Sequence, residues 1–90
     1  MPEVTEELRI VNSLGLHARP AATLVQTVLK FQSDVHISLN GHRVNAKSIM
    51  GLLTLAAAQG SILVVTCTGP DADEALAAVR NLVEAGFGES

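Results

Sequence analysis

The sequence GLHARP, residues 15–20, marks the place where a pattern typical of a strand gives way to a pattern typical of a helix. Gly15 allows backbone geometry that other residues adopt only at a cost. Pro20 lacks an N–H group and is tolerated in the first turn of a helix, because an amide there has no intrahelical partner. We therefore predict a loop that leads through Gly15 into a helix.

The same stretch carries groups that suit a phosphate. The amides of a first helical turn point outward, and the helix dipole adds partial positive charge, so an anion is favoured there. Arg19 supplies a planar cation that fits phosphate oxygens, and His17 supplies a ring nitrogen able to act as a nucleophile near neutral pH. The alternative is that His17 only caps the helix or is solvated, since an isolated H-x-R pattern is a weak signal.

Composition limits the class of protein. The chain has 90 residues, of which 48% are hydrophobic, with two Phe and no Trp or Tyr, which predicts one domain over residues 1–90 with an aliphatic core. The formal net charge is -3 and the six Lys and Arg residues are scattered, so nucleic acid is not an expected partner. The lone Cys67 lies in an apolar run and is expected to be a buried, reduced thiol, which fits a reducing cytoplasm.

No apolar run approaches the ~18–20 residues of a membrane span. The first seven residues are acidic rather than basic, unlike a secretory signal. We therefore expect a cytoplasmic location without membrane insertion.

Hydrophobic periodicity predicts the elements. Alternation indicates strands over about residues 4–11, 35–39, 42–46 and 61–68. Helical spacing indicates helices over about residues 18–30 and 49–56. A third helix is expected after Asp71, with a frayed end at Gly86 and Gly88. The resulting order, β-α-β-β-α-β-α, predicts an α+β fold in which one antiparallel sheet has the helices on one face.

The stripes expected to be buried lie on the first and third helices. On the first they comprise Ala18, Ala21, Ala22, Val25, Val28 and Leu29, widened by Leu24, and on the third Ala75, Leu76, Val79, Leu82 and Val83.

Asn40-Gly41 is a strong hairpin signal, because both central positions of a type I′ turn need positive φ. Pairing across this turn sets Leu39 opposite His42, and His36 opposite Asn45. His36 and His42 then point to opposite faces and cannot share a metal, so we predict no metal site.

The second helix offers a cap and an exposed patch. Ser48 is expected to cap it, and Asp71 to cap the third helix with Glu74 completing a capping box. The second helix is apolar nearly all round, and a short helix cannot bury every side. We therefore expect Ile49, Met50 and Leu53 to be partly exposed as a docking surface; the alternative is that they all belong to the core.

Two motifs together carry a family resemblance. GLHARPA at residues 15–21 and KSIMGL at residues 47–52, about thirty residues later, closely resemble HPr, the histidine phosphocarrier of the bacterial phosphoenolpyruvate-dependent phosphotransferase system. The similarity covers essentially the whole chain. It implies an open-faced β-sandwich, with strand order 1-4-2-3 and three helices on one side.

The resemblance also implies roles for residues. His17 would accept a phosphoryl group on Nδ1 from phospho-Enzyme I and pass it to sugar-specific IIA domains, with Arg19 pairing with that group. Ile49, Met50 and Leu53 would form the docking patch for these partners. Ser48 matches a serine that a dedicated kinase, HPr kinase/phosphorylase, modifies in many members. The family implies a monomeric carrier that is transiently phosphorylated rather than a stand-alone enzyme, without cofactor.

Two departures and two alternatives remain at this point. Leu14 stands where several members have a small polar residue, and the capping role already explains Ser48. A regulatory binding module, docking other proteins under control of phosphorylation at His17 or Ser48, is one alternative function. A small domain that holds a metabolite anion between His17 and Arg19 is the other, disfavoured by the lack of a deep-pocket signature.

Overall fold

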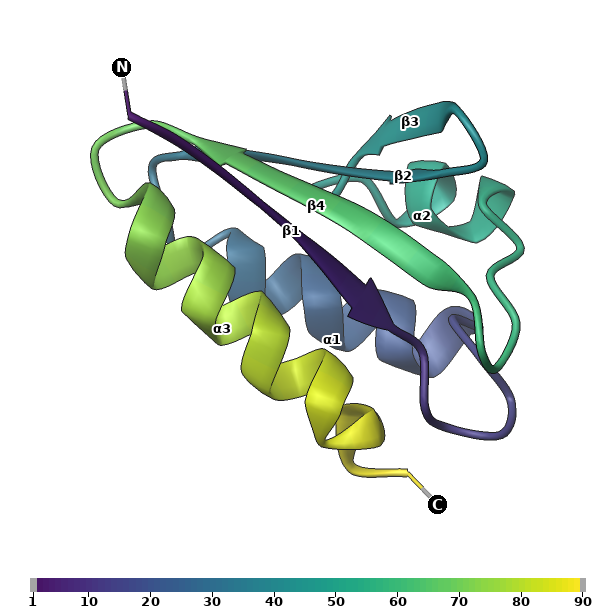
Figure 1. The fold of residues 1–90 in the computed structure, drawn as a ribbon. Coiled ribbons are helices and arrows are strands. Elements are labelled where there is room, and N and C mark those ends of the chain that lie inside the picture. The colour runs from purple at the N-terminus through teal and green to yellow at the C-terminus, as the bar shows by residue number, and fades with distance from the viewer. Residues whose placement is uncertain (1, 90) are drawn as a thin grey trace.

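The computed structural model describes residues 2–89. Its elements are β1 (Glu3–Arg9), α1 (Ala18–Val28), β2 (Asp34–Leu39), β3 (His42–Asn45), α2 (Ile49–Thr54), β4 (Ile62–Thr68) and α3 (Ala72–Glu84), followed by a 3₁₀ turn over Gly86–Gly88. The four strands form one antiparallel sheet in the order β1-β4-β2-β3. The helices cover one face of this sheet (Figure 1). The predicted element order, strand order and α+β class are confirmed.

The sheet is organised around β4, which pairs with both β1 and β2. Leu8 lies opposite Leu63, and Val35 lies opposite Cys67. Alternate residues of β4 are fully buried against the helices, as a half-covered antiparallel strand requires. Cys67 is a free, buried thiol, and burial, with a smaller effect of the Asp71 charge, raises its pKa to about 11.

The β2–β3 hairpin has the predicted register. Leu39 pairs with His42 and His36 with Asn45. Asn40 and Gly41 adopt φ values of 51° and 85°, as the type I′ turn needs. His42 Nε2 lies 3.0 Å from Thr54 Oγ1, which joins the hairpin to the end of α2.

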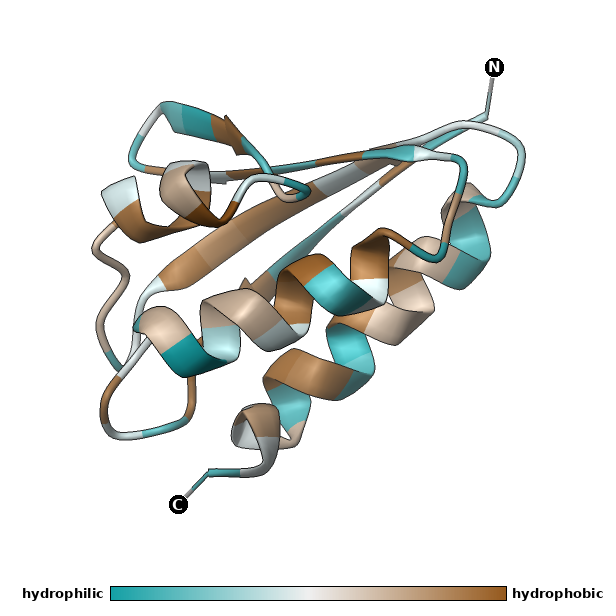
Figure 2. Cartoon of the chain, turned by 180° about the vertical axis from the view of Figure 1, so that it is seen from behind, coloured by the Kyte–Doolittle hydropathy of each residue, from teal (hydrophilic) through white to brown (hydrophobic). Residues whose placement is uncertain are grey.

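The core lies between the sheet and the helices, and the brown residues of β4 and of the facing helix sides mark it in Figure 2. The predicted stripe of α3 is buried apart from the half-buried Leu82. The stripe of α1 is centred differently from the prediction. Leu24 and Val28 are fully buried, whereas Leu29 is 59% exposed and Ala18 is exposed as well, so the prediction is wrong for these two ends of the stripe.

The predicted capping box of α3 is wrong. Asp71 is the N-cap residue by position, but its side chain makes no capping hydrogen bond. Its carboxylate instead accepts from the amides of Gln32 and Ser33, at 2.9 and 2.8 Å, and from Ser33 Oγ. These bonds tie the start of α3 to the turn before β2. A long-range partner has replaced the local one that the sequence pattern favours.

The end of α3 is not frayed. Gly88 N donates to the Ala85 carbonyl, and Glu89 N donates to the Gly86 carbonyl. Gly86 and Phe87 of this turn are buried, so the last described residues fold back on the domain. Within residues 2–89, no helix combines the length and the apolar character that crossing a membrane requires.

Candidate functional site

The loop before α1 is fixed against the segment that follows α2. Gly15 has a φ of 69°, and a Cβ there would lie 2.2 Å from the carbonyl oxygen of Ala57. The next amide, of Leu16, donates to that same oxygen at 2.8 Å, and the Leu16 side chain is 3% exposed. A glycine is therefore required both for its conformation and for the close approach, and the buried Leu16 anchors the residue that follows.

His17 is the N-cap residue of α1, with extended backbone and no side-chain capping bond. Its carbonyl accepts from the Ala21 amide at 3.0 Å, which starts the helix. Pro20 lies in the first turn as predicted. Because the imidazole is not used as a cap, it is directed to other partners.

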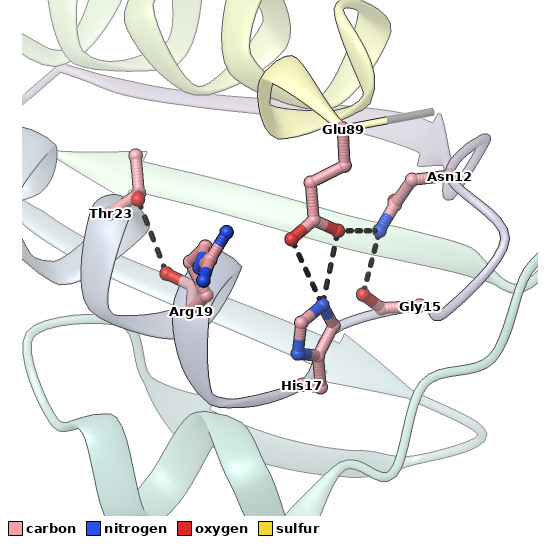
Figure 3. Close-up of polar contacts among 6 residues, drawn as sticks. All are labelled: Asn12, Gly15, His17, Arg19, Thr23 and Glu89. Carbon is pink, nitrogen blue, oxygen red and sulfur yellow. Dashed lines mark hydrogen bonds and ion pairs between the residues drawn. The ribbon is translucent and has the colours of Figure 1, made fainter.

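The partner of the imidazole comes from the opposite end of the chain. Both carboxylate oxygens of Glu89 lie 3.0 Å from His17 Nε2. Asn12 Nδ2 donates to Glu89 Oε1 at 3.0 Å and to the Gly15 carbonyl at 2.8 Å. Figure 3 shows this chain of contacts. The hydrogen bond with His17, the bond from Asn12 and the charges of His17 and Arg19 hold the pKa of the Glu89 carboxyl below its usual value.

This contact distinguishes the two nitrogens of His17. A carboxylate only accepts hydrogen bonds, so the nitrogen that faces it carries the proton. In the neutral ring the lone pair is then on Nδ1, which points away from Glu89 in Figure 3 and has no hydrogen-bond partner among the described residues. With 37% of the side chain exposed, Nδ1 can be reached by another molecule.

Arg19 supplies positive charge beside the ring. It is the second residue of α1 and is exposed, and within the described residues its guanidinium forms no salt bridge. A hollow of about 440 Å³ lies beside it, lined by Ser13, Leu14, Arg19, Gly88 and Glu89. The cation of Arg19 and the first-turn amides of α1, which have no intrahelical partners, suit a dianionic phosphoryl group.

An exposed apolar patch lies close to His17. We define it as Leu14, Ile49, Met50 and Leu53, whose exposed fractions are 73%, 37%, 69% and 36%. A hollow of about 330 Å³ connects it to the histidine and is lined by Leu14, Leu16, His17, Leu53, Ala56, Ala57 and Ala58. The prediction that part of α2 is exposed holds, and Leu14 enlarges the patch from the loop side.

Ser48 caps α2 as predicted. Its Oγ accepts from the Gly51 amide at 3.1 Å, and the side chain is exposed next to Ile49. Across the described residues, no three side chains of the His, Cys, Asp or Glu type come together as a metal site would require.

Sequence reasoning missed Asn12 and Glu89. Asn12 reads as an ordinary loop residue, and Glu89 is separated from His17 by 72 positions. The only hint was Phe87, one of two aromatic residues in the chain, set between two glycines near the end, where it can anchor a turn.

Comparison with known proteins agrees with this geometry. The family model described as the PTS HPr component phosphorylation site matches residues 4–85. The phosphocarrier protein HPr of Xylella fastidiosa strain Temecula1 is 51% identical over 83 residues, which cover 92% of this chain and 93% of that protein. The chain belongs to the HPr family. It is therefore a phosphocarrier of the phosphotransferase system, and it interacts with other components of that system.

Solved HPr structures share the whole fold. The crystal structure of HPr-C-His from Thermoanaerobacter tengcongensis has a TM-score of 0.89 and 46% identity, covering 100% of this chain and 99% of that one. The crystal structure of an HPr dimer from the same organism has a TM-score of 0.78 at 46% identity, covering 99% and 100%.

Proposed function

We propose that this chain carries its phosphoryl group on Nδ1 of His17, accepting it from phospho-Enzyme I and passing it to sugar-specific IIA domains. The observation that carries the proposal is the difference between the two ring nitrogens. Nε2 is held by Glu89 at 3.0 Å, while Nδ1 has no partner among the described residues on a ring that is 37% exposed. A nucleophilic nitrogen must present its lone pair to the incoming phosphorus.

The transfer needs little covalent chemistry from the carrier. The lone pair of Nδ1 forms the new bond to phosphorus, and the bond between phosphorus and the donor atom breaks, leaving its electron pair on the donor. Arg19 and the amides at the start of α1 stabilise the negative oxygens. The site is shallow and offers few donors, so the phosphoryl group is not trapped, and positioning between two docked proteins supplies most of the rate.

The apolar patch serves as the docking surface for both partners. Among the described residues, Met50 and Leu14 are the most exposed large apolar side chains, at 69% and 73%. Leu14 and Leu53 of the patch line the hollow that leads to His17. A partner that covers the patch removes apolar area from water and brings its own reacting group to the histidine.

Ser48 is a second modification site in this proposal, used by an HPr kinase/phosphorylase. Its exposed Oγ lies at the start of α2, next to Ile49 and Met50. A phosphate there would place two negative charges at the edge of an apolar interface, which disfavours docking.

We further propose that residues 1–90 form one domain that acts as a cytoplasmic monomer. The helices and the sheet of the described residues share one core, and an uncovered patch is what a shuttle between partners needs. Sedimentation at micromolar concentration is expected to give one copy, and a stable dimer that covers the patch would contradict this.

The experiment is phosphorylation by Enzyme I and labelled phosphoenolpyruvate. Wild-type protein is expected to acquire acid-labile label, and His17→Ala to acquire none while its thermal unfolding is unchanged. His36→Ala and His42→Ala are matched controls, because they remove the other two imidazoles and are expected to be labelled normally. Label on His17→Ala, or none on the wild type, would refute the assignment.

A further inference from the structure

Asn12, Glu89 and His17 form a chain of hydrogen bonds that phosphate carriage alone does not explain. Asn12 Nδ2 donates to Glu89 Oε1 at 3.0 Å, and Glu89 faces His17 Nε2 at 3.0 Å with both oxygens. We propose that Asn12 and Glu89 are positioning residues, which keep the proton on Nε2 and stabilise the positive charge that the ring gains when Nδ1 attacks phosphorus. The inference rests on the proposed function, phosphoryl transfer at His17.

A carboxylate beside Nε2 favours the transfer because the imidazole ring gains a positive charge when Nδ1 attacks phosphorus. The neutral ring starts with a proton on Nε2 and a lone pair on Nδ1. When that pair becomes the Nδ1–P bond, the electron pair of the old bond stays with the donor, and the ring keeps its Nε2 proton. The ring is then an imidazolium, and a carboxylate hydrogen-bonded to Nε2 stabilises it more in this state than before transfer.

The side-chain amide of Asn12 has a fixed orientation in which it holds Glu89. The side chain is 2% exposed, and its Nδ2 donates to Gly15 and to Glu89. Rotating the amide would set its oxygen against these two acceptors, so its orientation is fixed. In this orientation Asn12 Oδ1 is buried without a partner within the described residues. Such an atom costs free energy, and this kind of cost is tolerated mainly at functional sites.

The C-terminal turn brings Glu89 to this position. Phe87 is 9% exposed and has a φ of 56°, a left-handed conformation that is unusual for a bulky residue. The buried ring anchors the turn, and the Glu89 amide donates to the Gly86 carbonyl at 2.9 Å. Only 17% of the Glu89 side chain is exposed. The left-handed backbone at Phe87 is the kind of strain that is kept where it positions a functional group, here the Glu89 carboxylate.

The first measurement is the tautomer of His17 in the full chain. With ¹⁵N-labelled histidine, the two ring nitrogens give different shifts when one is protonated and the other is not. At alkaline pH, where an imidazole is neutral, wild type is expected to show the proton on Nε2 alone. Glu89→Ala is expected to show admixture of the Nδ1-protonated form. A proton on Nδ1 in wild type, or identical shifts in the two proteins, would overturn the inference.

The second measurement is the rate of phosphoryl acceptance from phospho-Enzyme I. Glu89→Ala is expected to lower kcat roughly fivefold to tenfold, as the loss of a partly exposed charge-assisted hydrogen bond predicts, with KM unchanged. Glu89→Gln keeps an acceptor but loses the charge, so a loss of roughly twofold to threefold is expected. Glu84→Gln, which removes a nearby exposed carboxylate, is the matched control and is expected to behave as wild type.

The role of Asn12 is tested by combining its substitution with the substitution of Glu89. If Asn12 acts by holding Glu89, then Asn12→Ala slows transfer, and the double variant with Glu89→Ala is no slower than Glu89→Ala alone. Gln59→Ala, which removes a different side-chain bond to the same loop, at Val11, is the control for general loosening. Additive effects would overturn the role of Asn12, and an unchanged kcat in Glu89→Ala would overturn the inference. Labelling of wild type but not of His17→Ala would still uphold the proposed function.

Discussion

At the scale of single residues, the site works because neighbouring groups have separate tasks. His17 is held on one nitrogen and open on the other. Arg19 forms no salt bridge within the described residues and remains available to an incoming anion. Ser48 uses its hydroxyl to cap α2 while facing solvent beside the apolar patch. Ser48 thus combines a structural task with a proposed regulatory one, whereas Arg19 is left free for its proposed chemical task.

The task of Arg19 is separable from docking. Arg19→Ala is expected to lower kcat for phosphoryl acceptance roughly tenfold, the size of one partly exposed charge-assisted contact, and to leave KM for Enzyme I nearly unchanged. Stopped-flow or quench-flow kinetics measure both values. Arg43→Ala on β3, which removes another exposed arginine, serves as the control. An Arg19→Ala protein that transfers at the wild-type rate would remove the residue from the mechanism.

Ser48 is expected to control docking rather than chemistry. Ser48→Asp should weaken affinity for Enzyme I by about tenfold, because it puts a charge beside an apolar interface. Ser48→Ala should lower stability by about 1 kcal/mol through loss of the cap without weakening docking. Calorimetric titration measures the affinity. Asn81→Asp on α3 adds the same charge elsewhere, and an equal effect there would count against a local switch.

At the scale of elements, long-range contacts fix the ends of helices. The Asp71 carboxylate joins the start of α3 to residues 32 and 33, and the Gly86–Gly88 turn after the same helix brings Glu89 to His17 at the start of α1. The loop before α1 rests on Ala57. The site lies where the start of α1 meets the segment after α2 and the turn after α3, whereas the Asp71 tie holds the other end of α3.

The tie at Asp71 predicts an acid dependence of stability. Hydrogen bonds from the Ser33 hydroxyl and from the Gln32 and Ser33 amides lower the pKa of Asp71 below its usual value of 3.8. A group whose pKa is lower in the folded state stabilises the fold above the unfolded pKa, and this contribution is lost as the pH falls through the folded pKa.

Asp71→Asn should therefore be less stable than wild type at pH 7. The difference between the two proteins should begin to shrink near about pH 5 and vanish as the pH falls through the lowered pKa of Asp71. Thermal unfolding at a series of pH values measures this difference. If the stabilities of the two proteins differ by the same amount at every pH, Asp71 does not contribute in the way the contacts indicate.

At the scale of the whole molecule, patterns in the sequence predict the elements better than the site. The alternation in β4, the Asn40-Gly41 turn and the spacing in α3 are local signals, and the structure confirms the elements they indicate. The strand order followed from the resemblance to HPr, because periodicity does not specify which strands pair.

His17 and Arg19 could be predicted because one short stretch holds both. The Glu89 contact could not, since it joins residues 72 positions apart and depends on how the end of α3 turns back. The capping box at Asp71 failed for the same reason, because a tertiary partner displaced the local one.

The most direct test of the account is to identify the nitrogen that carries the phosphoryl group. The chain is labelled with ¹⁵N-histidine and phosphorylated by Enzyme I and phosphoenolpyruvate, and the coupling between ³¹P and ¹⁵N is measured. The account predicts coupling to Nδ1 of His17, the nitrogen that does not face Glu89. Coupling to Nε2 of His17, or to a nitrogen of any other residue, would contradict it.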